Sequence, residues 1–350
     1  MLIDIALYYV GGRGGVEAVT TKVVKGLKKK GHKVRVLIAY PPPHNEWINS
    51  LDEVYYYGNG VLNASYDYLG ESYKNLMNKI GRPDICIAGH IPFQSYICYL
   101  GLNNTLGNKS IPILSWLHGD INIYANPQLI EYAKGHLAIS SAIKKGIESY
   151  DKKRAYLVYN PIDISKDIIV ERPKDEVLKI LSIGRLEEEK NLFMLLHALN
   201  RVKGKWQVNI IGDGSKRKVL ENVAKILNIN EKINWSGWKE EPWKDIKEAS
   251  ICISTSNTEG FSMVLAEALA RGIPVISTRS GGPMDIVQNG INGWLVDKNI
   301  YFNLAEVLNK IIQKELPLPL QQVCIGSVEK FREETVINNI ENVIISELKA

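Results

Sequence analysis

Short apolar runs alternate with amphipathic stretches along almost the whole chain. Runs rich in β-branched residues, such as Ile3–Val10 and Ile251–Thr255, predict buried strands. After the first of these, apolar residues recur at helical spacing from Val16 to Leu27. A repeated order of strand and helix is typical of parallel α/β domains.

The predicted strands fall into two series. The first comprises Ile3–Val10, Lys33–Tyr40, Asp84–His90, Pro112–His118, His136–Ser140 and Ala155–Tyr159, with a helix near 93–103. The second comprises Leu178–Arg185, Trp206–Asp213, Ile233–Gly237, Ile251–Thr255, Pro274–Thr278 and Gly293–Val296. Between them the pattern breaks near Asn160–Pro161, and the polar, Pro-containing segment 163–176 reads as a linker.

The fold class expected from this pattern is α/β, with two Rossmann-like, doubly wound domains facing a central cleft. The domains are predicted at 1–160 and 161–327. The last segment, 328–350, is predicted to form a charged amphipathic helix that packs back on the first domain.

Length and composition fit this picture. The chain has 350 residues, of which 45% are hydrophobic and 23% charged, as expected for two globular domains. It has no apolar run of 18 residues, and it begins in a strand, so we expect a cytoplasmic protein without a membrane span. The four cysteines, Cys86, Cys98, Cys252 and Cys324, stand singly in apolar contexts and are expected to be reduced core residues.

Positive charge is concentrated in the first half. Residues 1–160 carry 18 Lys or Arg against 12 Asp or Glu, whereas 161–350 carry 25 against 26. The excess lies between Lys22 and Arg35, and it indicates either a solvated helix face or a patch for an anionic acceptor or a membrane surface. Nucleic acid is disfavoured as a partner, because no basic-aromatic binding motif accompanies these charges.

The strongest candidate for chemistry is the stretch Ile251–Thr278. It predicts a strand, a polar loop with Glu259, a helix from about Ser262 to Arg271, and another strand. Ser262 is a plausible N-cap, and the amides of Phe261, Ser262 and Met263 would form an anion site at the helix start. Glu267 completes a carboxylate pair. The alternative is a solvent-facing Glu259 with Glu267 complementing the helix dipole.

Two further loops could contact a phosphorylated ligand. The turn from Gly11 to Gly15 is rich in glycine, but Glu17 stands where a dinucleotide fingerprint needs its third glycine, so an NAD enzyme is disfavoured. The turn is then either a merely tight connection or a phosphate or sugar contact. Arg185 and Lys190 could neutralise a diphosphate leaving group. The sequence has no Asp-x-Asp pair for a metal, so we expect no metal and no cofactor.

Several motifs together resemble a known family. GGRGGVE, SIGRLEEEKN, IIGDG, TEGFSMVLAEALARGIPVIST and SGGPMDI, in this order, look like the family 4 retaining glycosyltransferases of GT-B architecture. Within that family, HLAISSAIKKGI, KGKWQVNIIGDGSKRK and INWSGWKEEPW look closest to bacterial lipopolysaccharide 1,6-galactosyltransferases. This closer match is concentrated after residue 136, and region 41–110 departs from it.

The resemblance implies roles for individual residues. Glu259 would contact the donor hexose, Glu267 would hold the ribose hydroxyls, and Arg185 with Lys190 would bind the diphosphate. His118 would reach the donor sugar and the reaction centre. The remaining candidates for donor binding are Gly14, Gly15, Asp213, Gly214, Trp238, Lys239, Gly260, Phe261, Ser262 and Met263.

The function implied by the resemblance is metal-independent transfer of a hexose, of galactose or glucose type, from a UDP-sugar to a glycan or lipid-linked acceptor. Segment 41–70, with His44, Trp47 and three tyrosines at 55–57, is expected to help choose the acceptor. Peripheral contact with the inner face of the plasma membrane through the basic first domain is a further expectation. Two alternatives stay open: a GT-B sugar-nucleotide epimerase, and a non-catalytic partner that binds nucleotide sugars.

Overall fold

The chain folds into two compact units. The computed structural model describes residues 1–61, 63–103, 110–165 and 169–349. The first unit consists of Met1–Pro161 and Glu333–Ala350, and the second of Ile162–Arg332. Residue 62 of the predicted acceptor segment, residues 166–168 of the predicted linker and residue 350 of the predicted terminal helix lie outside the described residues.

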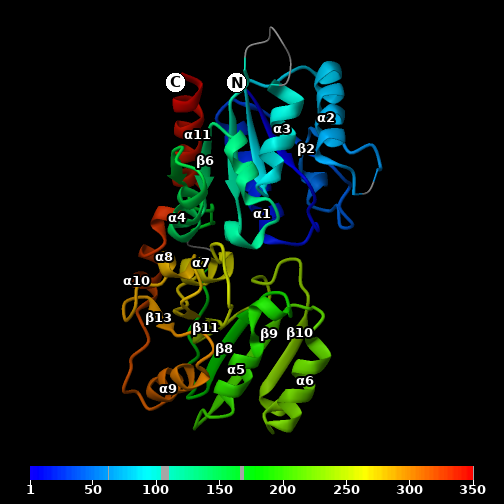
Figure 1. Cartoon of the computed structure of the whole chain (residues 1–350). Helices are drawn as coiled ribbons and strands as arrows, with labels where there is room; N and C mark the ends of the chain where they lie inside the picture. Colours follow the sequence, from blue (N-terminus) through cyan, green and yellow to red (C-terminus); the bar gives the residue numbers. More distant parts are fainter. Residues whose placement is uncertain (62, 104–109, 166–168, 350) are drawn as a thin grey trace. The chain divides into compact units, whose positions relative to one another are not determined.

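The first unit is built on a seven-stranded parallel sheet with the order β3-β2-β1-β4-β5-β6-β7 (Figure 1). Its strands are β1 (Leu2–Leu7), β2 (Lys33–Ile38), β3 (Val54–Tyr56), β4 (Ile85–His90), β5 (Ile113–Leu117), β6 (Gly135–Ala138) and β7 (Ala155–Leu157). Its helices are α1 (Gly15–Lys29), α2 (Tyr66–Ile80), α3 (Phe93–Asn103), α4 (Ser141–Tyr150) and α11 (Glu333–Lys349). The central strands are buried on both faces, which explains their continuous apolar runs.

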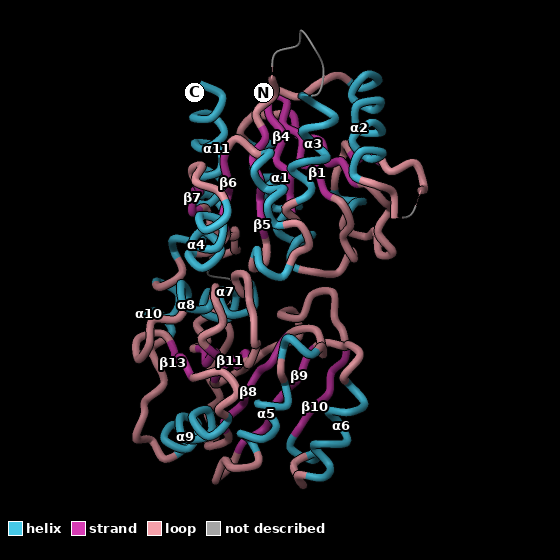
Figure 2. Tube along the Cα trace, in the orientation of Figure 1, coloured by secondary structure: helices cyan, strands magenta, loops and turns pink. Residues whose placement is uncertain are grey.

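The second unit contains a six-stranded parallel sheet with the order β10-β9-β8-β11-β12-β13 (Figure 2). Its strands are β8 (Leu178–Ile183), β9 (Trp206–Ile211), β10 (Ile233–Gly237), β11 (Ile251–Ser254), β12 (Val275–Thr278) and β13 (Gly293–Val296). Its helices are α5 (Leu192–Leu199), α6 (Arg217–Ile226), α7 (Met263–Ala270), α8 (Pro283–Ile286), α9 (Tyr301–Ile312) and α10 (Gln321–Gly326). Both sheets are doubly wound, so the predicted α/β class with two Rossmann-like domains is confirmed.

The structure adds an element that the pattern analysis left out. Helix α2 occupies Tyr66–Ile80 and so includes the last residues of the predicted acceptor segment 41–70. Its start has a recognisable signal, because the Ser65 hydroxyl accepts a hydrogen bond from the Tyr68 amide at 3.2 Å. Leu69, Tyr73 and Met77 then recur at intervals of four residues and are buried.

The predicted terminal helix is interrupted at its start. Residues Glu329–Phe331 form a 3-10 turn, and α11 begins only at Glu333. The turn is anchored within the second unit, since the buried Phe331 ring packs edge-on against Phe261 with centroids 5.0 Å apart. Arg332 also donates to the carbonyl of Ile164. The continuous helix expected over 328–350 was therefore wrong in its first turn, because packing of Phe331 overrides local helical propensity.

Helix α11 belongs to the first unit although it ends the chain (Figure 1, red). It packs closely on α1 at Gly26. A Cβ atom added to this glycine would lie only 2.5 Å from the Ile337 side chain of α11. Glu341 pairs with Lys30 at 2.8 Å and contacts His32 at 2.7 Å. The terminal helix thus completes the first unit.

Candidate functional site

A small pocket of the second unit lies at the carboxyl ends of β8 and β11. The strand order reverses between these two strands, and ligands of open parallel sheets bind at such a point. Polar side chains and a glycine line much of the pocket: Ser182, Gly184, Arg185, Lys190, Ser254 and Ser256. Both predicted phosphate-binding cations therefore line one pocket.

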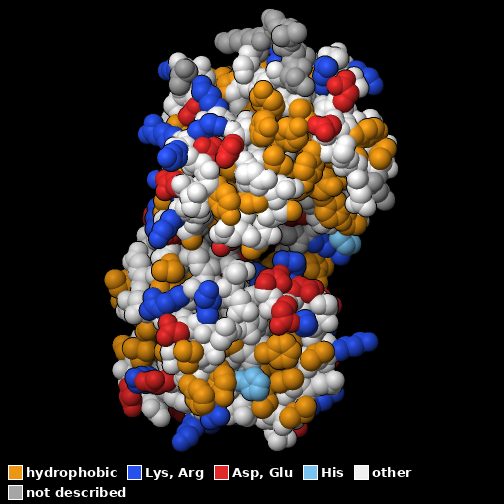
Figure 3. Space-filling model, in the orientation of Figure 1, with side chains coloured by type: hydrophobic (Ala, Val, Ile, Leu, Met, Phe, Trp, Pro, Cys, Tyr) orange, Lys and Arg blue, Asp and Glu red, His pale blue; other side chains and the backbone are white. Residues whose placement is uncertain are grey.

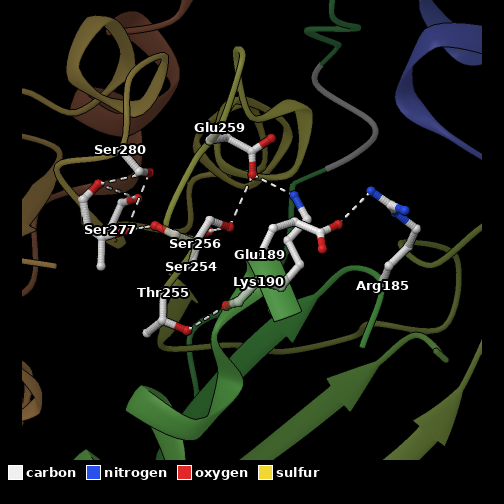
Figure 4. A network of polar contacts seen from close by, with 10 residues as sticks. Arg185, Glu189, Lys190, Ser254, Thr255, Ser256, Glu259, Ser277 and Ser280 are labelled. Atoms are coloured by element: carbon white, nitrogen blue, oxygen red, sulfur yellow. Dashed lines mark hydrogen bonds and ion pairs between the residues drawn. The ribbon is translucent and has the colours of Figure 1, made fainter. Parts of the chain in front are cut away.

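The carboxylate of Glu259 accepts hydrogen bonds from two residues that line this pocket (Figure 4). Its Oε2 accepts hydrogen bonds from Lys190 Nζ at 2.7 Å and from Ser256 Oγ at 3.2 Å. The side chains of Lys190 and Glu259 are only 22% and 17% exposed, so water screens this ion pair less than a surface pair. The arrangement fixes one carboxylate and one ammonium side by side at the end of the sheet.

The backbone of the Glu259 loop is held by the segment that follows β12. The Glu259 amide donates to the Ser280 carbonyl at 2.8 Å, and the Gly282 amide donates to the Glu259 carbonyl at 2.9 Å. A Cβ on Gly282 would lie 2.3 Å from the Cα of Phe261, so only glycine permits this approach. The segment SGGP therefore positions Glu259.

Ser262 is the N-cap residue of α7, as predicted, but the expected hydrogen bond of its hydroxyl is absent. Ser262 adopts a left-handed backbone with φ 84°, and its side chain makes no capping hydrogen bond. The helix begins one residue later, at Met263. Phe261 is 2% exposed and packs on Phe331, so only its backbone could meet a ligand. Gly260 connects these residues to Glu259 in the same loop. The strained Ser262 backbone, rather than a side-chain cap, shapes the helix start.

Glu267 has a partner that the sequence did not suggest. Its Oε2 accepts a hydrogen bond from Trp243 Nε1 at 2.8 Å. The guanidinium of Arg271 lies 4.5 Å from the centroid of the Trp243 ring. Glu259 and Glu267 are thus held by different groups, Lys190 and Trp243. No local spacing signals the Trp243 contact, because 24 residues separate the two partners.

The other candidates of the second unit lie in three loops. Arg185 is 65% exposed at its side chain and pairs with Glu189 at 2.8 Å. Asp213 accepts from the Gly214 amide at 2.8 Å, and a Cβ on Gly214 would approach the Leu186 carbonyl to 2.6 Å. That glycine is required for the turn.

The loop after β10 presents the candidates for the nucleotide base. The Trp238 side chain is 44% exposed, which excludes simple core packing. Lys239 pairs with Asp245 at 2.6 Å, and this exposed pair is expected to be weak. An indole ring at the surface beside β10 suits stacking on a base better than the lysine does.

In the first unit, a carboxylate occupies the glycine-rich turn. The buried Glu17 accepts from the amides of Gly12 at 2.6 Å and Gly14 at 3.1 Å. This explains why glutamate stands where a dinucleotide fingerprint has glycine. The Gly14 amide is therefore engaged by Glu17 here, and Gly15 begins α1. A Cβ on Gly12 would meet the His44 carbonyl at 1.7 Å, so segment 41–50 packs against this turn.

His118 follows β5 directly and is partly exposed, but its Nε2 is buried without a hydrogen-bond partner among the described residues. Burial, with a smaller contribution from His90, lowers the pKa of His118 to about 3. The imidazole is therefore neutral at pH 7. The His90 ring lies 6.4 Å away, centroid to centroid, and sequence reasoning assigned it no role.

His136 lies between a serine and an aspartate, an arrangement that resembles a catalytic triad. His136 Nδ1 lies 2.8 Å from Ser115 Oγ, and its Nε2 lies 3.1 Å from Asp151 Oδ2. Ser115 and His136 are fully buried, so no substrate can reach the hydroxyl. This chain of hydrogen bonds joins β5, β6 and the end of α4 and is structural. The four cysteines are buried and free, as predicted.

The basic stretch near α1 is partly neutralised. Arg35 is 3% exposed and forms a bidentate pair with Asp4, at 2.7 and 2.9 Å. Lys28 pairs with Asp52, and Lys30 with Glu341. Within the described ranges, no helix is long and apolar enough to cross a membrane. The same residues contain no group of three or more His, Cys, Asp or Glu arranged to hold a metal ion.

Comparisons with known proteins identify the family. Residues 163–331 match the glycosyl transferases group 1, and residues 13–166 match glycosyltransferase family 4. The chain is 30% identical to a lipopolysaccharide 1,6-galactosyltransferase of Salmonella typhimurium over 97% of each protein. Its fold superposes on a lipopolysaccharide outer core galactosyltransferase in the apo form with a TM-score of 0.86, at 27% identity over 99% of this chain and 100% of that one.

A more distant likeness concerns the fold alone. An Anabaena protein, HepE, solved in complex with UDP-glucose, superposes with a TM-score of 0.80 at 18% identity over 98% of this chain and 99% of that one. The near full-length relationship to the Salmonella enzyme and the two family matches agree with the doubly wound sheets. The chain is thus a glycosyltransferase of family 4 with the GT-B fold.

Proposed function

We propose that this enzyme transfers a hexose, of galactose or glucose type, from a UDP-sugar to a glycan or lipid-linked glycan in cell-surface polysaccharide synthesis, with retention of configuration. The observation that carries this proposal is the Lys190–Glu259 pair at the strand-order reversal of the second sheet. Two of its relatives are galactosyltransferases of lipopolysaccharide, which supports the choice of sugar and acceptor class.

The second unit would bind the donor. Lys190 and Arg185 line one pocket and can neutralise the diphosphate, while Glu259 orients the hexose. Glu267, held by Trp243, is suited to accept hydrogen bonds from the ribose hydroxyls. Trp238 would stack on the uracil base. In this assignment Lys190 serves two purposes, because it also orients Glu259.

The proposed chemistry is a front-face displacement. The acceptor oxygen bonds to the anomeric carbon on the face from which UDP departs, and the bond between that carbon and the phosphate oxygen breaks. The acceptor proton passes to an oxygen of the leaving diphosphate. Lys190 and Arg185 would stabilise the charge that remains on UDP. We propose that these cations, without a metal ion, perform that task.

The first unit would bind the acceptor. Aromatic rings contact one another along α3: Tyr66 stacks on Phe93 with centroids 4.6 Å apart, and Tyr132 contacts both Tyr96 and Tyr99. Figure 3 shows hydrophobic side chains gathered on this face of the first unit. Exposed aromatic rings with hydroxyl tips suit both the apolar faces and the hydroxyl groups of sugars. His118 would contact the sugar at the reaction centre.

A donor screen tests the proposal. The purified chain is heated with UDP-, GDP- and ADP-sugars in the presence of EDTA, and released nucleotide is measured. We expect one UDP-hexose to raise the Tm, since a ligand of the folded state stabilises it by mass action. Slow UDP release that survives EDTA should accompany this shift. A shift that requires metal would remove the assigned role of the cations, and no shift with any nucleotide sugar would favour a non-catalytic partner.

Contact with the membrane surface and a cytoplasmic location stay predictions. Lys25, Lys29 and Lys33 are exposed and could meet anionic lipids, with about 1 kcal/mol expected for each lysine near the surface. Sedimentation with phosphatidylglycerol vesicles, compared with neutral vesicles and with high salt, measures this contact. Equal sedimentation with both vesicle types would argue against it.

A further inference from the structure

His90 stands at the strand-order reversal of the first sheet. It is the last residue of β4, and β1 and β4 are the neighbours between which the order changes direction. In the parallel register His90 is opposite Leu117 of β5, so it lies next to the position from which His118 follows. Ligands of such sheets bind at this point, at the carboxyl ends of the strands.

The backbone of His90 is strained. Its φ is 80°, a left-handed conformation that side chains with a Cβ rarely adopt and that glycine adopts without penalty. Such strain collects at functional sites, where the surrounding structure holds it. Among the described residues the ring Nδ1 of His90 has no hydrogen-bond partner, so no side-chain hydrogen bond from this atom compensates for the strain. Glycine would adopt this backbone conformation more easily than histidine, so the conformation alone does not account for a histidine at this position.

Two neighbouring imidazole rings each have a nitrogen without a hydrogen-bond partner among the described residues. His90 Nδ1 and His118 Nε2 are both buried without a hydrogen bond among the described residues, and the two ring centroids are 6.4 Å apart. A buried polar group without a partner destabilises the fold. Both residues are partly exposed as a whole, and a ligand would reach the two buried nitrogens after a small movement of the side chains around them.

The two rings have the same chemistry. Burial lowers the pKa of His90, although the Glu17 carboxylate opposes this, and burial lowers the pKa of His118 as well. Each neutral ring offers one N–H donor and one acceptor nitrogen. That combination complements hydroxyl groups, which both donate and accept, and it does not select for a charged group.

We propose that His90 binds a hydroxyl group of the hexose at the reaction centre, beside His118, and so positions that sugar. The inference rests on the proposed glycosyl transfer and adds a second sugar-binding histidine to it. The hydroxyl can belong to the hexose of the donor or to that of the acceptor. Both offer the same chemistry, and the kinetic experiment separates them.

The test uses the full chain with His90→Gly and His90→Asn. Glycine relieves the left-handed backbone, and asparagine tolerates it while keeping a donor and an acceptor. Asn228→Gly is the matched control, because Asn228 has φ 55° in the second unit and no assigned role. The measurements are the Tm, the UDP released from UDP-galactose alone, and the transfer to D-glucose or D-galactose.

We expect His90→Gly to keep or raise the Tm while transfer falls at least about 10-fold, as for a lost positioning contact. His90→Asn should recover part of this loss, and the control should stay fully active. A donor contact lowers UDP release with and without acceptor, whereas an acceptor contact lowers only transfer and raises the KM for the hexose.

Two results overturn the inference. A lower Tm of His90→Gly together with lost activity would make His90 structural, and full activity of this variant would remove its sugar contact. If the wild-type chain neither transfers a hexose nor releases UDP from any UDP-sugar, the proposed function fails together with the inference. An active wild type with an equally active His90→Gly leaves the proposed function intact and removes only the inference.

Discussion

Replacing Lys190 with alanine should disable the enzyme more than it destabilises it. The Nζ of Lys190 lies 2.7 Å from Oε2 of Glu259, and the two side chains are 22% and 17% exposed. At an effective dielectric constant of about 20, unit charges at this separation attract by about 6 kcal/mol. Desolvation opposes much of that attraction. The net contribution of a charged hydrogen bond to the free energy of unfolding is about 1.5–3 kcal/mol.

The effect of Lys190→Ala on turnover should be larger than its effect on the free energy of unfolding, because two functions are lost together. Lys190→Ala removes a positive charge from the leaving diphosphate and leaves Glu259 without the group that orients it. Loss of one preorganised donor at developing charge costs about 10²–10³ in kcat, or about 2.7–4 kcal/mol. We therefore expect kcat to fall by about this factor, while the fold is retained.

The assay is UDP release from UDP-galactose, measured for Lys190→Ala, for Glu259→Gln and for the double variant. If the two side chains act as a pair, the double variant should lose less than the product of the single losses. Lys216→Ala is the matched control, because its Nζ pairs with Glu188 at the same 2.7 Å but in an exposed position. Retention of more than about a tenth of kcat by Lys190→Ala, or strictly multiplicative losses, would refute the reasoning.

Three further predictions concern the surrounding structure. Trp243→Phe removes the hydrogen-bond donor to Glu267, so the Kd for UDP measured by calorimetry should rise about 10-fold, as expected for the loss of a charged hydrogen bond. An unchanged Kd would contradict the proposed contact of Glu267 with the ribose. Gly282→Ala places a Cβ 2.3 Å from a backbone carbon of the Glu259 loop and should lower both the Tm and the activity, whereas Gly326→Ala, with nothing within 4 Å, should not. Burial lowers the pKa of His118 from 6.5 to about 3, so between these values the unfolded chain binds more protons than the folded chain. The free energy of unfolding should therefore decrease as the pH falls below about 6.5, by about 2 kcal/mol at pH 5. His118→Gln should remove that part of the pH dependence of the Tm, and an unchanged slope would contradict it.

Much of the fold and some of the site follow from local sequence. Short apolar runs bounded by turn residues predict strands, so β4, β10 and β13 were predicted to within a residue. Parallel strands place their carboxyl ends on one edge of a sheet. The sequence could therefore assign His118, Lys190 and Glu259 to the loops after three strands.

The partners of these residues depend on contacts that no local pattern contains. Lys190 meets Glu259 across 69 residues, and Trp243 meets Glu267 across 24. Tertiary packing also overrode local signals, since the burial of Phe331 interrupts the predicted terminal helix.

By itself, the sequence determined the two α/β series, the loops that carry the candidate residues and the family they resemble, because these depend on periodicity and short motifs. Only the tertiary structure decided that Trp243 holds Glu267 and that the left-handed Ser262 makes no side-chain cap on α7. It also decided that His90 is strained beside His118. Backbone dihedral angles and hydrogen-bond partners are set by the packing of distant segments, which a single sequence does not record.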